Sequence, residues 1–471
     1  MSMTTDHAVT EALSLFGDWF LPTSPERRLA GQLSYDPPRI ELLVNGTFRP
    51  DVPDVVLVGS DYPIVHGFTH EGEAITLIHS RCIERRSGNA SVQVDSERVL
   101  AQYLLIGAYA NENSTYPAFA FRVPGLQVWL SREIIQQSVE VENEPSAVTH
   151  VYRVLDRKEK SVYVPSIRST LSWFVGYTSV VNPFLSIAVN TAGRFVLRPD
   201  SARHLDWYLG QYPKITTLLS IISGGPLFAD CMSAFLDPTP RNTCSLVFST
   251  PGERYWERPR PKDFYVSCSE LGIEFSEILC RWFTAYDRID TVSRLAASVL
   301  TSQNLWPHVE FLSLMHVLEG FHRSLYHGLY MPVEAYENIK QSLYAAIPPD
   351  ISSSHRSALR SRIAYGNEIS LRRRLNDLAK NLSLIVRKRI FGNEDGSVPG
   401  QWVDTRNFYS HWYPNSKSNL LEKNELIHAN VRMRHFLRAL YLNLLQVPED
   451  AIQCGVFGSS DDGRFLTHIN E

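Results

Sequence analysis

The stretch from Val309 to Tyr326, VEFLSLMHVLEGFHRSLY, decides the fold of the C-terminal third of this chain. Its large apolar side chains recur every three or four residues, the period that puts them on one face of an α-helix. This stripe consists of Leu314, Leu318, Phe321 and Leu325. Pro307 stands just before it, where the fixed φ of proline suits the first turn of a helix. The pattern therefore predicts one long amphipathic helix.

From about residue 270 to the C-terminus the same helical spacing recurs and strand patterns stop. Breakers such as Pro348-Pro349 and Gly392 separate the segments. The further helices predicted are 273–286, 292–300, 332–346, 371–390, 403–412 and 419–445. Together they indicate an all-α bundle of about 160 to 180 residues, which we place at 286–471.

Toward the N-terminus the chain consists of short β-branched runs separated by Gly, Pro, Asp and Ser. Strands are expected at 39–44, 47–48, 55–58, 74–78 and 92–94. Asn45-Gly46 is the predicted hairpin turn between the first two. Gly125 to Leu130 fits either a strand or the lead into a helix. The pattern predicts a β-rich domain over residues 1–165, an antiparallel sandwich or barrel.

Residues 166–285 give mixed signals. Strands are predicted at 173–177, 184–189, 245–248 and 264–266, a helix at 205–223, and an exposed loop at 253–262. We interpret this region as a mixed α/β continuation of the N-terminal region. The fold class predicted for the chain is α+β multidomain, with a β-rich N-terminal half followed by an all-α helical bundle.

Composition limits the class of protein. The chain has 471 residues and a formal net charge of -4, which excludes a basic coat but not a local basic cleft. No run of about 18 apolar residues predicts a membrane span, and Met1 to Glu11 lacks the pattern of a signal peptide. The six cysteines are scattered without a C-x-x-C pair, which argues against a disulfide framework and a zinc site. We expect a cytoplasmic protein with no membrane association, no metal and no other cofactor.

The segment 404–412, DTRNFYSHW, is where the sequence becomes chemically specific. Arg406 is followed by the polar Asn407 and, after three more residues, by His411, on a short predicted helix. Asn407 and His411 are four residues apart and share one helix face, with Arg406 about 100° around. The three side chains are therefore the candidate functional residues.

Spacing alone is a weak signal, because an arginine followed at this distance by a histidine is expected by chance in such a chain. Arg198 and His204 have a similar spacing, but Pro199 follows the arginine and the segment is not helical in pattern. That pair serves as a control. The context of the first motif differs, since Asp404 or Thr405 is expected to cap its helix at an end that favours phosphate.

These residue types suit cleavage of RNA without a metal. The 2′-hydroxyl of RNA can attack the adjacent phosphate when one group accepts its proton and another donates to the leaving oxygen, and histidine can do either. Arginine binds two phosphate oxygens and stabilises charge in the transition state, while asparagine orients the phosphate or the imidazole. We predict Arg406, Asn407 and His411 as catalytic residues of an endoribonuclease. The alternative is a short helix on which they only pair with neighbours.

The C-terminal region resembles the HEPN domain of the ApeA family of anti-phage proteins. The resemblance rests on FLSLMHVLEGFHR at 311–323 and RNFYSH at 406–411. The N-terminal half is similar to the β-rich domain that precedes HEPN in that family. Its matching stretches are GDWFLP at 17–22, GQLSY at 31–35, VHGFT at 65–69 and ITL at 75–77.

The resemblance implies an abortive-infection effector whose HEPN domain cuts RNA. With His411 as the proton-transfer group, the cleaved RNA should end in a 2′,3′-cyclic phosphate or its hydrolysis product. The N-terminal region would sense or restrain, with a phage-derived trigger as a possible partner. The family's catalytic roles carry over to Arg406, Asn407 and His411. HEPN folds pair so that two motifs face one cleft, which implies at least a homodimer.

Other polar residues have simpler interpretations. Three histidines lie on the helix at 309–326 or just after it, at gaps of six and five that do not make a zinc pair: His316, His322 and His327. Glu319 forms an i, i+4 pair with Arg323, although it could instead align His411 or face the cleft. The basic runs 372–374 and 387–389 are interpreted as solvated helix faces, with contact to RNA as the alternative.

Two other functions stay open. A HEPN protein that binds RNA or a partner without catalysis is the main alternative. The other is an enzyme or carbohydrate-binding module in the β-rich half, with the helices as an oligomerisation stalk. That half has no convergent acid pair or nucleophile in its sequence, which argues against the latter.

Overall fold

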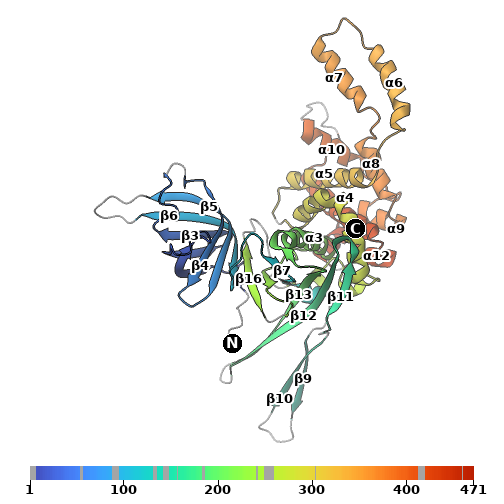
Figure 1. Ribbon diagram of the computed structural model, residues 1–471. Helices are drawn as coiled ribbons and strands as arrows, with labels where there is room; N and C mark the ends of the chain where they lie inside the picture. Colours follow the sequence, from blue (N-terminus) through green and yellow to red (C-terminus); the bar gives the residue numbers. More distant parts are fainter. Residues whose placement is uncertain are drawn as a thin grey trace. The chain divides into compact units, whose positions relative to one another are not determined.

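A computed structural model of the chain describes residues 7–53, 57–86, 95–130, 135–141, 148–155, 158–182, 186–239, 242–248, 259–302, 304–411, 419–458 and 460–470. The chain divides into two compact units (Figure 1). One comprises Met1–Leu219 and Pro226–Pro261, the other Ser220–Gly225 and Lys262–Glu471. Strands dominate the first unit and helices the second, so the predicted α+β class is confirmed.

Six strands of the first unit form a sheet that closes on itself. They are β1 (Leu13–Phe20), β2 (Leu29–Asp36), β3 (Arg39–Asn45), β4 (Asp61–Thr69), β5 (Ala74–Arg86) and β6 (Ser96–Ile106). Neighbours pair antiparallel in the order β6-β3-β2-β1-β4-β5, and β5 pairs again with β6. The closure leaves no free edge among these strands, which protects them from pairing with another chain.

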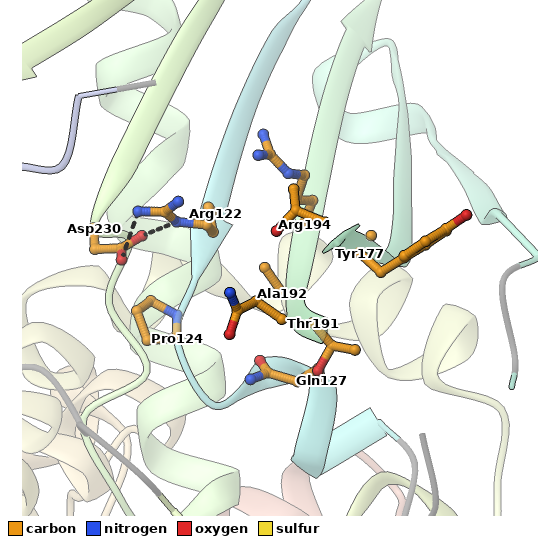
Figure 2. Close-up of a pocket in the computed structure, with 11 residues that line it drawn as sticks. Arg122, Pro124, Gln127, Tyr177, Thr191, Ala192, Arg194 and Asp230 are labelled. Atoms are coloured by element: carbon orange, nitrogen blue, oxygen red, sulfur yellow. Dashed lines mark hydrogen bonds and ion pairs between the residues drawn. The ribbon is translucent and has the colours of Figure 1, made fainter. Parts of the chain in front are cut away.

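The sheet continues beyond β6. Its further strands, in spatial order, are β16 (Thr243–Phe248), β15 (Cys231–Phe235), β8 (Phe119–Val123), β13 (Ser186–Pro199), β12 (Ser169–Asn182) and β11 (Lys160–Val164). Two small sheets join β7 (Thr115–Tyr116) with β14 (Arg203–His204), and β9 (Ile135–Val141) with β10 (Val148–Val154). Helix α2 (Leu126–Leu130) follows β8, and Arg122 of β8 lies opposite Arg194 of β13 (Figure 2). Helix α3 (Leu205–Ser223) has the predicted limits.

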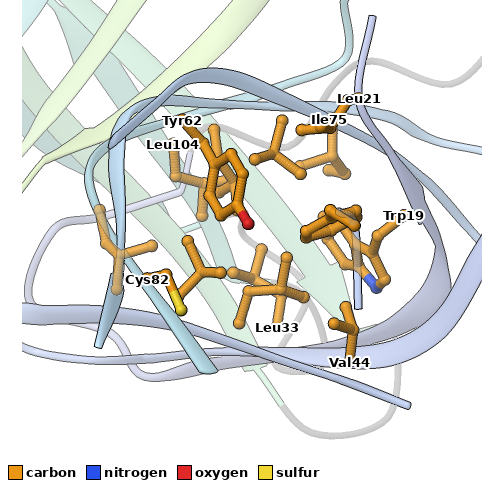
Figure 3. Packing of buried hydrophobic residues seen from close by; sticks show 14 of the residues in the cluster. Trp19, Leu21, Leu33, Val44, Tyr62, Ile75, Cys82 and Leu104 are labelled. Atoms are coloured by element: carbon orange, nitrogen blue, oxygen red, sulfur yellow. The ribbon is translucent and has the colours of Figure 1, made fainter. Parts of the chain in front are cut away.

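The core of the closed sheet follows from the two-residue period of a strand. Along β3, Ile40, Leu42 and Val44 are buried while residues between them are more exposed. Trp19 and Leu33 belong to the same buried cluster (Figure 3). The alternation seen in the sequence at 39–44 therefore places one face of each strand inside the closed sheet.

The second unit is helical. Its helices are α4 (Phe275–Thr301), α5 (Pro307–Leu325), α6 (Val333–Ala345), α7 (Ser353–Ala364), α8 (Leu371–Ala379), α9 (Leu384–Phe391), α10 (Gly400–His411), α11 (Lys423–Leu444), α12 (Glu449–Phe457) and α13 (Asp461–His468). α5 packs between α4 and α11. Its stripe of Leu314, Leu318 and Phe321 is buried, and Pro307 occupies the first turn, as predicted. In the described residues no helix is long and apolar enough to cross a membrane.

Several predictions for the first unit and its continuation were wrong or lie outside the described residues. Residues 47–48 are not in a strand, and neither are Leu57 and Val58 of the predicted strand 55–58, whose first two residues lie outside the described part of the chain. Asn45-Gly46 is not a hairpin turn, because the Gly46 amide donates to the Asp95 carbonyl at 2.6 Å. Thr47 Oγ1 and the Phe48 amide then donate to the buried Glu97 carboxylate at 2.9 and 3.1 Å. The segment 264–266 is a bend whose apolar side chains are buried, so hydrophobicity reflected burial and not a strand. The predicted strand at 92–94 and most of the 253–262 loop lie outside the described residues.

Helix boundaries also needed correction. The predicted helices 273–286 and 292–300 are one helix, α4, since Ile289 continues the buried stripe between them. The predicted helix 371–390 is two, because Ser383 caps α9 by accepting a hydrogen bond from the Val386 amide at 3.3 Å. Gly125 to Leu130 leads into a helix, α2. α7, α12 and α13 were not predicted.

Candidate active site

α10 is anchored by its apolar side. Trp402 is 1% exposed and its ring meets the Phe391 ring edge-on at 5.8 Å. Thr405 is fully buried and its Oγ1 accepts a hydrogen bond from the Leu421 amide at 3.0 Å. Burial of these two side chains fixes the rotation of the helix about its axis. The face that carries Arg406 is therefore held in a defined direction.

The expected cap of this helix is wrong. α10 begins at Gly400, so Asp404 and Thr405 lie within the helix and not at its N-terminus. Asp404 Oδ2 instead accepts a hydrogen bond from Asn419 at 2.8 Å. The predicted end at Trp412 lies outside the described residues, and the described helix ends at His411.

Arg406 is held by α5. Its Nη2 lies 3.2 Å from Glu319 Oε2, and its Nη1 donates to Asn407 Oδ1 at 3.2 Å. The Arg406 side chain is 29% exposed and the Glu319 side chain 16%. The guanidinium is therefore oriented by a partly buried carboxylate while part of it still faces solvent. A planar group with five N–H donors can hold these partners and a phosphate oxygen together.

Glu319 is also bonded to Arg323, one turn further along α5. Arg323 Nε donates to Glu319 Oε1 at 3.1 Å, and Arg323 Nη1 lies 2.8 Å from Glu368 Oε2. Glu368 in turn pairs with Arg374, at 3.3 Å. We call Arg406, Glu319, Arg323, Glu368 and Arg374 the Glu319 network. It alternates guanidinium and carboxylate groups from α10 to α8, with a net charge of one positive unit.

The inner end of the Glu319 network, at Arg374, is buried against His322, and the pKa values of His322 and Arg323 are both shifted. Arg374 is 2% exposed, and its Nη1 lies 3.2 Å from His322 Nδ1. Burial, followed by the charge of Arg374, lowers the pKa of His322. Neutral His322 can then accept from Arg374 at Nδ1. Burial acts to lower the pKa of Arg323, but hydrogen bonds to Glu368 and Glu319 outweigh it and raise that pKa.

Asn407 and His411 lie one turn apart on α10. The His411 side chain is exposed and that of Asn407 is partly buried. Because Asn407 Oδ1 accepts from Arg406, its orientation is coupled to the arginine. The three sequence-predicted residues thus lie on one described helix, and two of them are hydrogen-bonded to each other. His411 is placed at the solvent-facing end of that helix.

Aromatic rings continue the site on α5. The His308 ring lies 6.1 Å from the Tyr409 ring with an interplanar angle of 29°, and the Trp306 ring lies 6.4 Å from His308 at 30°. We call Trp306, His308 and Tyr409 the Trp306 ladder. The Trp306 side chain is 73% exposed, an unusual position for so large an apolar ring. Sequence analysis missed this ladder, because nothing in the sequence relates 306–308 to 409.

The other polar candidates lie in different surroundings. His316 and His327 are exposed whereas His322 is buried against Arg374, so the three histidines do not share one environment. Within the described part of the chain, no group of three or more His, Cys, Asp or Glu side chains could hold a metal ion. The control pair lies on strands: Arg198 is in β13 and His204 in β14.

Arg374 of the first basic run differs from expectation, and Glu319 has a contact that was not predicted. Arg374 is not solvated but buried, because Glu368 and His322 provide its partners. Arg372 and Arg373 are exposed, as predicted, and pair with Asp404 and Asp377 at 3.6 and 3.5 Å. Glu319 forms the predicted i, i+4 pair with Arg323. It also forms an ion pair with Arg406, whereas the alternative predicted from the sequence was that it aligns His411 or faces the cleft.

Two family models match the chain. Residues 14–282 match ApeA N-terminal domain 1, and residues 312–451 match the Apea-like HEPN domain. The second match contains α10 and most of α5, the two helices that carry the Glu319–Arg406 pair. No curated protein and no solved structure matched the chain.

Proposed function

The chain belongs to the ApeA family, and from this premise we propose that it is an anti-phage effector whose HEPN domain cleaves RNA without a metal ion. The observation that carries the proposal is the geometry of Arg406. Glu319 and Asn407 fix a guanidinium that stays 29% exposed, on the helix that presents His411 to solvent. A site that must bind a phosphodiester and move a proton needs both groups.

The roles follow from the chemistry of the side chains. Arg406 stabilises the negative charge that develops on the phosphate oxygens as the 2′-hydroxyl attacks. His411 transfers the proton, either from the 2′-hydroxyl or to the leaving 5′-oxygen. Asn407 holds Arg406 through Oδ1 and orients the phosphate. The products are a 2′,3′-cyclic phosphate end and a 5′-hydroxyl end.

One motif supplies a single histidine, whereas the reaction needs a proton acceptor and a proton donor. We propose that two chains form a dimer through the HEPN domain, with both motifs in one cleft. The exposed end of α10 supports this arrangement, because it leaves His411 accessible to a partner copy. Mixing an excess of His411→Ala chains with wild-type chains should lower the activity of the wild type, because each mixed dimer has a single histidine in its cleft. Activity in a chain that stays monomeric by light scattering would contradict the shared cleft.

The proposed substrate is single-stranded RNA. The Trp306 ladder presents a 73% exposed indole and an exposed imidazole on the end of α5 that reaches Tyr409 of α10. Unpaired bases stack on such rings, whereas bases in a duplex are stacked on one another and are not accessible. A ladder next to the proposed catalytic helix therefore favours a strand whose bases are splayed out.

The test is incubation of the full chain with total cellular RNA in EDTA, beside His411→Ala and Arg406→Ala. Wild type should cleave and both variants should not, while expression and oligomeric state stay unchanged, because these side chains contribute little packing. Arg198→Ala with His204→Ala is the matched control and should cleave like wild type. Cleavage that requires Mg²⁺ and leaves 3′-hydroxyl ends, or loss of activity only in the control, would contradict the proposed site.

A binding module without catalysis is the second candidate. The observation that favours it is the Glu319–Arg406 pair itself, since a carboxylate already partners the arginine that would bind phosphate. The same variants separate the two functions. RNA that binds to wild type and to His411→Ala with equal affinity and is cut by neither would support the module.

A further inference from the structure

Strands β1 and β4 carry exposed aromatic rings on the outer side of the closed sheet. Trp19 of β1 is buried inside that sheet (Figure 3), so Asp18 has its side chain on the outer side, and so does Phe16 two residues earlier. Antiparallel pairing places Asp18 directly opposite Phe68 of β4, and directly opposite residues lie on the same side of a sheet. Phe16 is 56% exposed and Phe68 45%. We call the outward surface of Phe16, Asp18 and Phe68 the Phe68 face.

Next to the Phe68 face, the same side of β1 is already covered. Phe20 lies opposite His66, and their rings are 5.7 Å apart. The Tyr109 ring lies 6.0 Å from Phe20 and 4.8 Å from His66. The Arg28 guanidinium lies 5.6 Å from the centre of the Phe20 ring. These neighbours leave Phe20 only 9% exposed, whereas the rings of the Phe68 face contact no other ring or guanidinium in the described residues.

The carboxylate at the centre of the Phe68 face has no counter-ion. Within the described ranges the Asp18 side chain forms no hydrogen bond and no ion pair, although the residue is partly buried. Its neighbours on β2 are neutral, since Asp18 lies opposite Ala30, and Gln32 lies opposite Phe16. Ala30 contributes a single methyl group, which can neither neutralise the carboxylate nor cover it. Asp18 is therefore a negative charge beside two exposed rings.

The turn between β4 and β5 adds negative charge beside this face. The His70 amide donates to the Phe16 carbonyl at 3.0 Å, which holds the turn next to β1. Glu71 and Glu73 of the turn form no ion pair in the part of the chain that the structure describes. With Asp18 they are three carboxylates, against the one guanidinium that packs on Phe20. The surroundings of the Phe68 face therefore favour a positively charged ligand.

Aromatic rings beside an unpaired carboxylate match the guanidinium of an arginine. The face of an aromatic ring attracts a cation, and the planar fork of arginine can bind both oxygens of a carboxylate. Nucleic acid is a poor occupant, because its phosphates would be repelled by the three carboxylates. Exposed apolar surface that is rimmed by polar groups is typical of contact with another protein.

We propose that the Phe68 face binds a basic segment of a partner protein. One arginine of that segment places its guanidinium on the Asp18 carboxylate and against the rings of Phe16 and Phe68. The proposal concerns the N-terminal unit and does not depend on RNA cleavage by the helical unit.

The test is fluorescence anisotropy of the full chain with a short labelled peptide of alternating arginine and serine. The same peptide with citrulline in place of arginine has nearly the same shape without the charge. The arginine peptide should bind with a Kd below about 100 μM, and the citrulline peptide at least about tenfold more weakly. Asp18→Asn should weaken binding of the arginine peptide by about fivefold or more, and Phe68→Ala by about 2- to 30-fold.

Asp200→Asn is the matched control and should bind the arginine peptide like wild type. Asp200 is a carboxylate beside an exposed aromatic ring elsewhere in the same unit, since Tyr163 Oη donates to its Oδ2 at 2.9 Å and Tyr163 is 48% exposed. Thermal melting should show that all three variants are folded. Asp18→Asn keeps the size of the side chain, and Phe68→Ala removes a ring on the outer side of the sheet, so each tests the face independently of the other.

Several results would overturn the proposal. Wild type that does not bind the arginine peptide has no such site, and equal binding of the citrulline peptide removes the role of charge. Equal losses in Asp18→Asn and Asp200→Asn would mean that the peptide binds acidic surface in general. Wild-type affinity in Phe68→Ala would exclude the rings. A short single-stranded DNA lacks the 2′-hydroxyl and cannot be cut by the proposed reaction; if Phe68→Ala abolished its binding, the rings would bind bases and not arginine.

Discussion

Replacing Glu319 by Gln tests whether the carboxylate positions Arg406 for catalysis. The substitution keeps the size of the side chain and an oxygen that can accept from Arg406 Nη2, now 3.2 Å away. It removes the negative charge that the two arginines share. Glu319 does not touch the proposed substrate in this account, so it is a positioning residue. Its loss should lower kcat and leave KM nearly unchanged.

The magnitude follows from the type of hydrogen bond. A bond to a charged group contributes about 1.5 to 3 kcal/mol and a bond between neutral groups about 0.5 to 1.5 kcal/mol. The glutamine oxygen would still accept from a charged guanidinium, so the change costs at most the difference between these two classes, about 1 to 1.5 kcal/mol, which is at most about a 5- to 13-fold loss of kcat if it is expressed in the transition state. Glu319→Ala removes the acceptor altogether and should lower kcat by about 10- to 150-fold.

The assay is cleavage of a labelled single-stranded RNA in EDTA, with kcat and KM measured separately. Arg323→Gln is the control, because it removes the other partner of Glu319 and leaves the Arg406 pair intact. It should change kcat by less than about threefold, since the Arg323 side chain is 48% exposed and its pairs are screened by solvent. Thermal melting of each variant separates loss of position from loss of folding.

Two results would refute the reasoning. Glu319→Gln that cleaves faster than wild type would mean that the carboxylate holds Arg406 away from phosphate. Equal loss in Glu319→Gln and Arg323→Gln, together with lower melting temperatures in both, would mean that the Glu319 network only stabilises the unit.

Three further outcomes are expected. Trp306→Ala should raise KM for single-stranded RNA by about 5- to 100-fold with kcat nearly unchanged, since base stacking contributes about 1 to 3 kcal/mol; an unchanged KM in steady-state kinetics would exclude the ladder from substrate binding. Burial and the charge of Arg374 lower the pKa of His322 below its ordinary 6.5. The unfolded chain therefore binds this proton more readily than the folded chain does. The stability that comes from neutral His322 is fully present above pH 6.5 and is lost as the pH falls. His322→Gln should therefore show a smaller drop in Tm between about pH 7.5 and 5.5 than wild type, and calorimetry that finds equal drops would contradict this. Burial raises the pKa of the Cys82 and Cys244 thiols to about 12, so mass spectrometry should find both unlabelled by a thiol reagent at about pH 8 until the chain is denatured.

The spacing of apolar residues was sufficient to predict a helix or strand where the segment buries one regular face. The stripe of α5 and the strand at β3 both appear in the structure as predicted, because each packs one regular face against a core. The pattern failed where burial had another cause. Residues 264–266 are apolar because they are buried in a bend, and periodicity cannot distinguish a buried bend from a short strand.

Strand order was not predictable from these segments. Asn45-Gly46 has the composition of a hairpin turn, yet β3 pairs with β2 and with β6, whose residues come about fifty positions later. The hydrogen bond from Gly46 to Asp95 depends on that distant strand. The free energy by which two residues favour a turn is small compared with that of pairing a whole strand. Pairing of β3 with β6 therefore determined the conformation at Asn45-Gly46.

For the candidate site, the sequence indicated which residues are candidates for catalysis but not what holds them. The motif's helix and the shared face of Asn407 and His411 follow from spacing alone. Glu319 was interpreted as the i, i+4 partner of Arg323, a contact within one helix, and the alternatives were that it aligns His411 or faces the cleft. Its contact with Arg406 joins residues on α5 and α10 that are far apart in the chain, and no single sequence gives the packing of two helices.

The two arginine–histidine pairs of similar spacing show why the groups that hold an arginine matter more than its distance from a histidine. Arg198 pairs with Glu159 on the surface of a sheet, and both side chains are exposed, at 39% and 47%. Such a pair contributes about 0 to 1 kcal/mol and does not fix the guanidinium. Arg406 and Glu319 are 29% and 16% exposed, and Glu319 continues through Arg323 and Glu368 to a guanidinium that is almost fully buried. Only this second arrangement holds an arginine in one position while leaving part of it open, which is what stabilising a developing charge on phosphate requires.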